Sequence, residues 1–174
     1  RVAEKIALLE NTFDFKKPKS SIPLLLEIRD AILATGDPYW KQIKLEECEA
    51  VIQKCLGLFI ELRTNEFRVT PSSSIPVTLE VINRSDIEAT LVSMIYEPMD
   101  TVFTFDQTLT YNIGLIKPLQ LTVPTKLSIP FWLASPQAEG LYKVDNQLER
   151  CAPADPPAMS AKVLVKVGSH LIPF

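Results

Sequence analysis

The sequence has little of what metal and cofactor chemistry requires. Its only histidine is His170, which has no cysteine or histidine nearby at the spacing of metal ligands. A serine or cysteine nucleophile usually needs a histidine base, and His170 would have to serve alone. We therefore interpret His170 as a surface residue and expect no catalytic residue, no metal site and no cofactor in this chain.

Glycine and cysteine are also scarce. The five glycines are isolated, so they form neither a phosphate-binding loop nor a dinucleotide turn. The three cysteines form no disulfide framework, because Cys48 and Cys55 are about 10 Å apart along a predicted helix. Both are expected to be small buried hydrophobic residues. Cys151 lies in a proline-rich loop, where we expect it to be exposed.

Charge and hydropathy limit the partners. The net charge of −3 argues against a general nucleic-acid or anionic-membrane surface. The one basic cluster, "KKPK" at residues 16–19, is interpreted as a solvated turn in preference to a phosphate site. No apolar run approaches the ~20 residues of a membrane span.

The chain begins without methionine, inside a predicted helix, which is typical of a piece of a longer protein. Its compartment therefore stays open, and a periplasmic or secreted parent protein is one alternative.

The first part of the chain has the apolar period of helices. Apolar residues recur every three or four positions, which predicts helices over about 2–13, 22–35 and 38–63. Ser21 and Asp37 are expected to cap the second and third helices, each with a proline in the first turn. The short connections indicate antiparallel neighbours.

After Thr64 the apolar period drops to two, as in strands. The clearest strands are "PVTLEVINRS", "LQLTV" and "AKVLVKV", and further strands are predicted at 66–70, 89–96, 102–106, 127–133 and 141–144. "NRS" at 83–85 fits a glycosylation sequon but is interpreted as a turn. Seven or eight short strands predict an immunoglobulin-like antiparallel β-sandwich, without the cysteine and tryptophan spacing of true immunoglobulin domains.

The expected fold class is therefore α+β. We predict a helical segment of about three helices at 1–64, packed on a β-sandwich domain at 65–174 as one compact unit.

Two aromatic residues stand apart from those expected to fill the core. The alternation at 127–133 places Trp132 on the opposite strand face from Phe131. We expect that face to carry the helices. If it were exposed instead, Trp132 and Tyr142 would be the first candidates for stacking against a sugar.

Three segments of the chain resemble segments of a known family and occur in the same order. They are "AILATGDPYWKQIKLEECEAVIQKCLGLFIEL", "IPVTLEVINRSD" and "IPFWLASPQAEGLYKVDNQ…PADPPAMSAKVLVKV". Over most of residues 20–167 the chain resembles the non-catalytic region downstream of the catalytic domain in bacterial LmbE/PIG-L-type N-acetylglucosaminyl deacetylases. In that family a helical "YW…K…I..C.GL..E" segment precedes a sandwich with an "NRS" turn and a "YWL…G.Y.V.D" corner.

The resemblance implies a supporting role. Deacetylases of this family carry an AHPDD-type metal motif and a further histidine, and nothing in this chain matches them, so no catalytic residue is carried over. The implied function is a non-catalytic accessory domain, and the implied partner is a metal-dependent deacetylase domain of the same parent chain. A carbohydrate-binding module that uses exposed aromatic residues is the alternative, and an independent enzyme is the least favoured.

Overall fold

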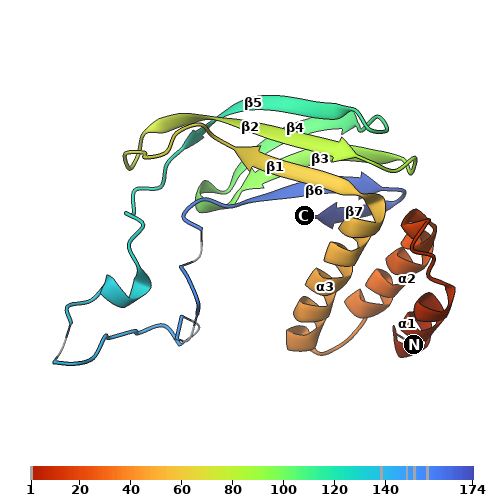
Figure 1. Cartoon of the computed structure of the whole chain (residues 1–174), viewed down its shortest axis with the longest axis horizontal. Coiled ribbons are helices and arrows are strands. Elements are labelled where there is room, and N and C mark those ends of the chain that lie inside the picture. The colour runs from red at the N-terminus through yellow and green to blue at the C-terminus, as the bar shows by residue number, and fades with distance from the viewer. Residues whose placement is uncertain (1, 138, 148, 151, 156) are drawn as a thin grey trace.

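The computed structural model describes residues 2–137, 139–147, 149–150, 152–155 and 157–174. Within this part the chain forms three α-helices and seven strands in two antiparallel sheets (Figure 1), which confirms the α+β prediction. The helices are α1 (Val2–Thr12), α2 (Ile22–Leu33) and α3 (Pro38–Leu56). The strands are β1 (Leu58–Arg63), β2 (Ser74–Asn83), β3 (Ala89–Tyr96), β4 (Thr101–Thr108), β5 (Gly114–Thr122), β6 (Ala161–Val167) and β7 (His170–Pro173). The short 3-10 helices are η1 (Pro18–Ser21), η2 (Glu97–Met99) and η3 (Phe131–Leu133).

One of the two predicted helix caps is present. The Asp37 carboxylate accepts hydrogen bonds from the backbone N–H groups of Tyr39, at 3.0 Å, and Trp40, at 3.1 Å. Ser21 makes no such bond, so its prediction as a side-chain cap is wrong. The reason is that η1 leads directly into α2, which leaves Ser21 with helical backbone angles instead of the extended ones that a capping residue adopts.

The third helix is shorter than its apolar period predicts. It ends at Leu56, because Gly57 adopts a left-handed conformation with φ of 59° and its N–H bonds to the carbonyl of Lys54. The next six residues form β1, which pairs antiparallel with β2. The prediction of helix as far as residue 63 is therefore wrong, and the last part of the predicted 1–64 helical segment belongs to a sheet.

The two sheets have strand orders β1-β2-β5 and β4-β3-β6-β7. The predicted strands at 89–96, 102–106 and "AKVLVKV" are present, as are those in "PVTLEVINRS" and "LQLTV". In β2 the alternate residues Ile75, Val77, Leu79 and Val81 are buried, so the period of two sets which face enters the core.

A single apolar core joins the strands to the helices. Buried side chains of β2, β3 and β6 belong to the same cluster as those of α2 and α3. The hydroxyl of Tyr96, on β3, donates a hydrogen bond of 2.9 Å to the carbonyl of Thr122, at the end of β5, and so links the two sheets. Figure 1 shows the three-stranded sheet lying over the four-stranded one, with the helices at one side.

Polar contacts fix α2 against α3 and β7. The Arg29 guanidinium lies 2.8 Å from the Glu49 carboxylate, and both side chains are almost fully buried. Arg29 also donates to the carbonyl of Leu171, at 3.3 Å. On the neighbouring position of β7, His170 Nε2 lies 3.0 Å from Asp30 Oδ2. His170 is thus part of the helix–sheet boundary, with its side chain one-quarter exposed.

The "NRS" segment forms the predicted turn. Asn83 is buried, its side-chain N–H donates to the carbonyl of Ile87, and its side-chain oxygen accepts from the N–H and the hydroxyl of Ser85. These bonds hold the β2–β3 connection and leave Arg84 exposed at its tip.

Three predicted strands are not formed. Residues 66–70 belong to the loop of the β1–β2 hairpin, where Phe67 is fully exposed. Among the described residues of 127–133 and 141–144 there is one short 3-10 helix, η3, and no strand of a sheet. Pro124, Pro130 and Pro136 interrupt this region and remove backbone donors that a sheet would need.

This region forms a long excursion between β5 and β6, residues 124–160, which we call the arm. Figure 1 shows the arm projecting away from the sheets, at the end of the molecule remote from the helices. Phe131 N–H donates to the Asp155 carboxylate at 2.7 Å, which joins the two limbs of the arm. Cys151, predicted to be exposed, lies outside the described residues.

Candidate functional site

The structure places both predicted aromatic residues on the arm. Trp132 is half-buried, and its ring meets the Phe131 ring edge to face, with the ring centres 4.8 Å apart. Tyr142 is exposed over 54% of its surface and lines a hollow together with Phe131. Phe131 therefore brings Trp132 and Tyr142, ten residues apart in sequence, to one part of the arm.

The expectation that Trp132 packs on the helices is wrong. The residue belongs to η3, and Figure 1 shows the arm and the three helices on opposite sides of the view. The alternation at 127–133 had assigned Trp132 to one face of a strand. Because no strand forms at 127–133, there is no sheet face on which Trp132 could meet the helices. The helices pack near β7 instead, where Arg29 donates to the carbonyl of Leu171.

The hollow on the arm combines aromatic and charged groups in a volume of about 470 Å³. Asp145 and Arg150 supply charge, and the Lys143 ammonium lies 3.4 Å from the Asp145 carboxylate. Aromatic faces beside hydrogen-bonding groups are the surface that a sugar ring requires, because its C–H groups stack and its hydroxyls bond.

A second hollow is an apolar groove between the three helices, of about 450 Å³. Val2 and Ile6 line it from α1, Ile28 from α2, and Trp40 and Val51 from α3. Trp40 is 55% exposed. α1 has no buried residue, so it covers the other two helices only in part.

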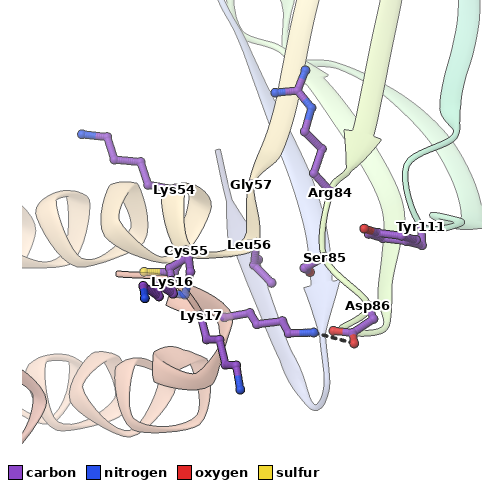
Figure 2. Close-up of a pocket in the computed structure, with 12 residues that line it drawn as sticks. Lys16, Lys17, Lys54, Cys55, Leu56, Gly57, Arg84, Ser85, Asp86 and Tyr111 are labelled. Carbon is purple, nitrogen blue, oxygen red and sulfur yellow. Dashed lines mark hydrogen bonds and ion pairs between the residues drawn. The ribbon is translucent and has the colours of Figure 1, made fainter. Parts of the chain in front are cut away.

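A third hollow is a basic cleft of about 400 Å³, shown in Figure 2. It lies where the turn before α2, the end of α3 and the "NRS" turn meet. Its charged lining residues are Lys16, Lys17, Lys19, Lys54, Arg84 and Asp86. Of the "KKPK" residues, which were predicted to form a turn, Lys16 lies in a turn and Pro18 and Lys19 begin η1. The sequence did not show that Lys54 and Arg84, far away along the chain, lie beside them.

One ion pair spans the basic cleft. The Lys19 ammonium lies 2.5 Å from the Asp86 carboxylate, and this hydrogen bond lowers the pKa of Asp86 below its usual value. In the described part of the chain, Lys16, Lys17 and Lys54 have no carboxylate within ion-pair distance. Figure 2 shows the Tyr111 ring on the opposite wall from Cys55.

The two described cysteines are buried thiols, as predicted. Cys48 is 7% exposed and Cys55 is 8% exposed. Burial, with a smaller contribution from the Glu49 charge, raises the pKa of the Cys48 thiol from 9.0 to about 11, and burial also raises the pKa of Cys55. Both groups are therefore thiols and not thiolates at neutral pH.

No group of three or more histidine, cysteine, aspartate or glutamate side chains in the described residues is placed to hold a metal ion. None of the helices within the described ranges has the length and apolar character that crossing a membrane requires. No family model, curated protein or solved structure matches the chain. The family relationship and the function are therefore proposals that rest on the residues and on the geometry.

Proposed function

We propose that this chain is a non-catalytic accessory domain of an LmbE/PIG-L-type deacetylase, which binds the catalytic domain of the same parent chain through the arm. The observation that carries the proposal is the apolar surface of the arm. Among the described residues of the arm, the large apolar side chains that are exposed are Leu127, Ile129, Leu133, Leu141 and Tyr142. The arm also contains most of the third segment that resembles the family.

The free energy that it costs to expose these apolar side chains to water supports the proposal that a partner covers the arm. Leu127 is 66% exposed and Leu141 is 72% exposed. Burying a leucine side chain stabilises a protein by roughly 1.5–3 kcal/mol, so an arm with several such residues gains most when a second surface covers it. A catalytic domain joined to the same chain would be present at high effective concentration.

The body of the domain fits the same proposal. The body has a three-stranded and a four-stranded antiparallel sheet, linked by the Tyr96–Thr122 hydrogen bond. An immunoglobulin-like sandwich is built from two such sheets.

The binding test compares two surfaces of similar exposure. The residues that precede Arg1 in the parent protein are expected to contain an AHPDD-type domain, and that domain should bind the purified 174-residue chain. The variant L127S/I129S/L133S should weaken this binding at least tenfold by titration calorimetry. The control I113S/I116S changes β5 and the turn before it, at 60% and 55% exposure, and should bind like the unchanged chain.

An activity measurement tests the non-catalytic role. The purified chain is expected to release no acetate from N-acetylglucosaminyl substrates when zinc is added. Zinc-dependent turnover by the chain alone would overturn the proposal, as would equal weakening of domain binding by the arm and control variants.

The alternative is a carbohydrate-binding module, and the hollow beside Tyr142 is the observation that favours it. Trp132 touches the wall of this hollow through Phe131, so a bound sugar should change its fluorescence. The variant W40F would leave Trp132 as the only tryptophan. Titration of W40F with chitin oligosaccharides should give a saturable change that Y142A abolishes, whereas a flat response across cell-wall glycans would exclude this alternative.

A further inference from the structure

The basic cleft concentrates positive charge in a chain whose net charge is negative. Five of the eighteen lysine and arginine residues line it, with Asp86 as the single carboxylate. They come from three separate segments: the turn before α2, the last turn of α3 and the β2–β3 turn. The fold therefore assembles this charge, which no single sequence segment contains.

The walls of the cleft approach each other closely, and three of its lysines are exposed. Gly57 has no side chain, and a Cβ there would lie 3.1 Å from the Arg84 Cβ, so the end of α3 and the "NRS" turn approach closely. The Arg84 guanidinium lies 5.2 Å from the centre of the Phe59 ring, which restrains it. Figure 2 shows Arg84 and Lys54 extending away from Asp86. Exposed lysine side chains change rotamer within nanoseconds, so Lys16, Lys17 and Lys54 can turn towards an incoming anion.

We propose that this cleft binds an anion that carries two or more phosphate groups. Asp86 neutralises Lys19, which leaves four cations whose charge nothing in the lining balances. A single carboxylate would satisfy one of them, whereas a diphosphate or triphosphate presents several charged oxygens within a few ångströms. The volume of about 400 Å³ is within the range of small-molecule sites, and the Tyr111 hydroxyl can donate a further hydrogen bond. The site is independent of the accessory role proposed for the arm.

The experiment measures binding of inorganic tripolyphosphate to the 174-residue chain by titration calorimetry in 50 mM salt. We expect one saturable site. The variant K16Q/K17Q removes two exposed cations that have no ion pair, and should weaken binding roughly tenfold per lysine. The control K41Q/K126Q removes two lysines outside the cleft, of which Lys41 is half-buried and Lys126 is exposed, and should leave affinity unchanged.

Replacing Asp86 gives a change of the opposite sign. D86N removes the only negative charge of the lining and frees Lys19, so tripolyphosphate should bind about three- to tenfold more tightly. Because the Lys19–Asp86 pair is exposed, its loss should leave the melting temperature nearly unchanged. A site that merely attracted anions over the whole surface would not distinguish K16Q/K17Q from K41Q/K126Q.

Equal weakening in those two variants, weaker binding by D86N, or no saturable binding up to millimolar tripolyphosphate would each overturn the proposal. Vesicles with and without a phosphoinositide identify the source of the phosphate. Competition by phosphoinositide vesicles would assign the site to a lipid headgroup, and tripolyphosphate binding that vesicles do not affect would assign it to a soluble ligand. Both results support a phosphate site.

Discussion

At the scale of single residues, Cys48 shows how packing sets the chemistry of a side chain. Its sulfur lies 3.7 Å from the carbonyl of Leu25, between α2 and α3. Burial favours the neutral thiol, and the neighbouring Glu49 charge acts in the same direction, while Arg29 opposes it. The thiol is consequently a small apolar group that joins two helices.

The raised pKa of Cys48 predicts a loss of stability at high pH. Below pH 9 the thiol is protonated in both states, but between pH 9 and about 11 only the unfolded chain releases its proton. The free energy of unfolding should therefore fall by roughly 2 kcal/mol from this residue as the pH rises through that range. Urea titrations at pH 8 and pH 11 measure the change.

The matched variant is C48A, which removes the titrating group. Its free energy of unfolding should fall less between the two pH values, since only Cys55 and the other groups still contribute. An identical fall in C48A and in the unchanged chain would show that Cys48 does not carry the effect.

At this scale a structural feature was predictable where the side chain of a single residue forms it. Asp37 caps α3 and Asn83 closes the "NRS" turn, as their side chains predicted. Gly57 is different, because the apolar period continues through Phe59 and Leu62 and favours a longer helix. The left-handed conformation of Gly57 ends the helix, and the residues that follow pair with β2 as the strand β1.

At the scale of elements, the Arg29–Glu49 pair connects α2 with α3, and the bond from Arg29 to Leu171 adds β7. Burial raises the pKa of Glu49 despite the hydrogen bond from Arg29, which shows that desolvation of the carboxylate outweighs its partner. A pair of this kind orients elements more than it stabilises them.

A double-mutant cycle tests this role. R29M and E49L should each lower the free energy of unfolding by roughly 3 kcal/mol, because each leaves a buried charge without its partner. R29M/E49L replaces both charges by apolar groups and should recover most of that loss, as measured by urea denaturation. Additive losses in the double variant would contradict this account.

Element type was predictable for all three helices and for five strands, since a sustained period of 3.6 or 2 identifies them, although α3 ends earlier than its period predicts. β7 has four residues, too few to show a period, and the pairing of β6 with β7 defines it as a strand. At 127–133 apolar and polar residues alternate, but the prolines in this region remove backbone N–H groups that pairing with another strand would need. In β7 and at 127–133 alike, backbone hydrogen bonding determined whether a strand formed.

At the scale of the whole molecule, the arm separates the last two strands from the rest of the four-stranded sheet. β6 lies in the interior of that sheet, paired with β3 and β7, although the arm precedes it in the chain. Lys126, Lys143 and Arg150 are exposed on the arm, which makes them the preferred sites for trypsin.

Brief trypsin treatment should therefore cut the arm first and leave the nicked chain folded. The buried residues Val163, Val165 and Val167 should hold the C-terminal fragment to β3, so both fragments elute together in gel filtration and separate in urea. The variant K126Q/K143Q/R150Q should be cut much more slowly. Fragments that separate without denaturant, or a first cut within α3, would contradict this description.

The sites of the molecule were less predictable than its elements. Trp132 and Tyr142 were identified as a pair of aromatic candidates, but their place on an arm follows from the failure of two predicted strands to form. The basic cleft unites "KKPK" with Lys54 and Arg84, and only the tertiary fold reveals that these charges are neighbours.

The contact between Arg29 and Leu171 also sets an order of events during synthesis. These residues are 142 positions apart, so the Arg29 guanidinium can meet the Leu171 carbonyl only after β7 has left the ribosome. Contacts of such separation slow folding. Arg29 can therefore meet Glu49, only 20 positions away, long before it meets β7, so α2 and α3 can pair before the four-stranded sheet is complete.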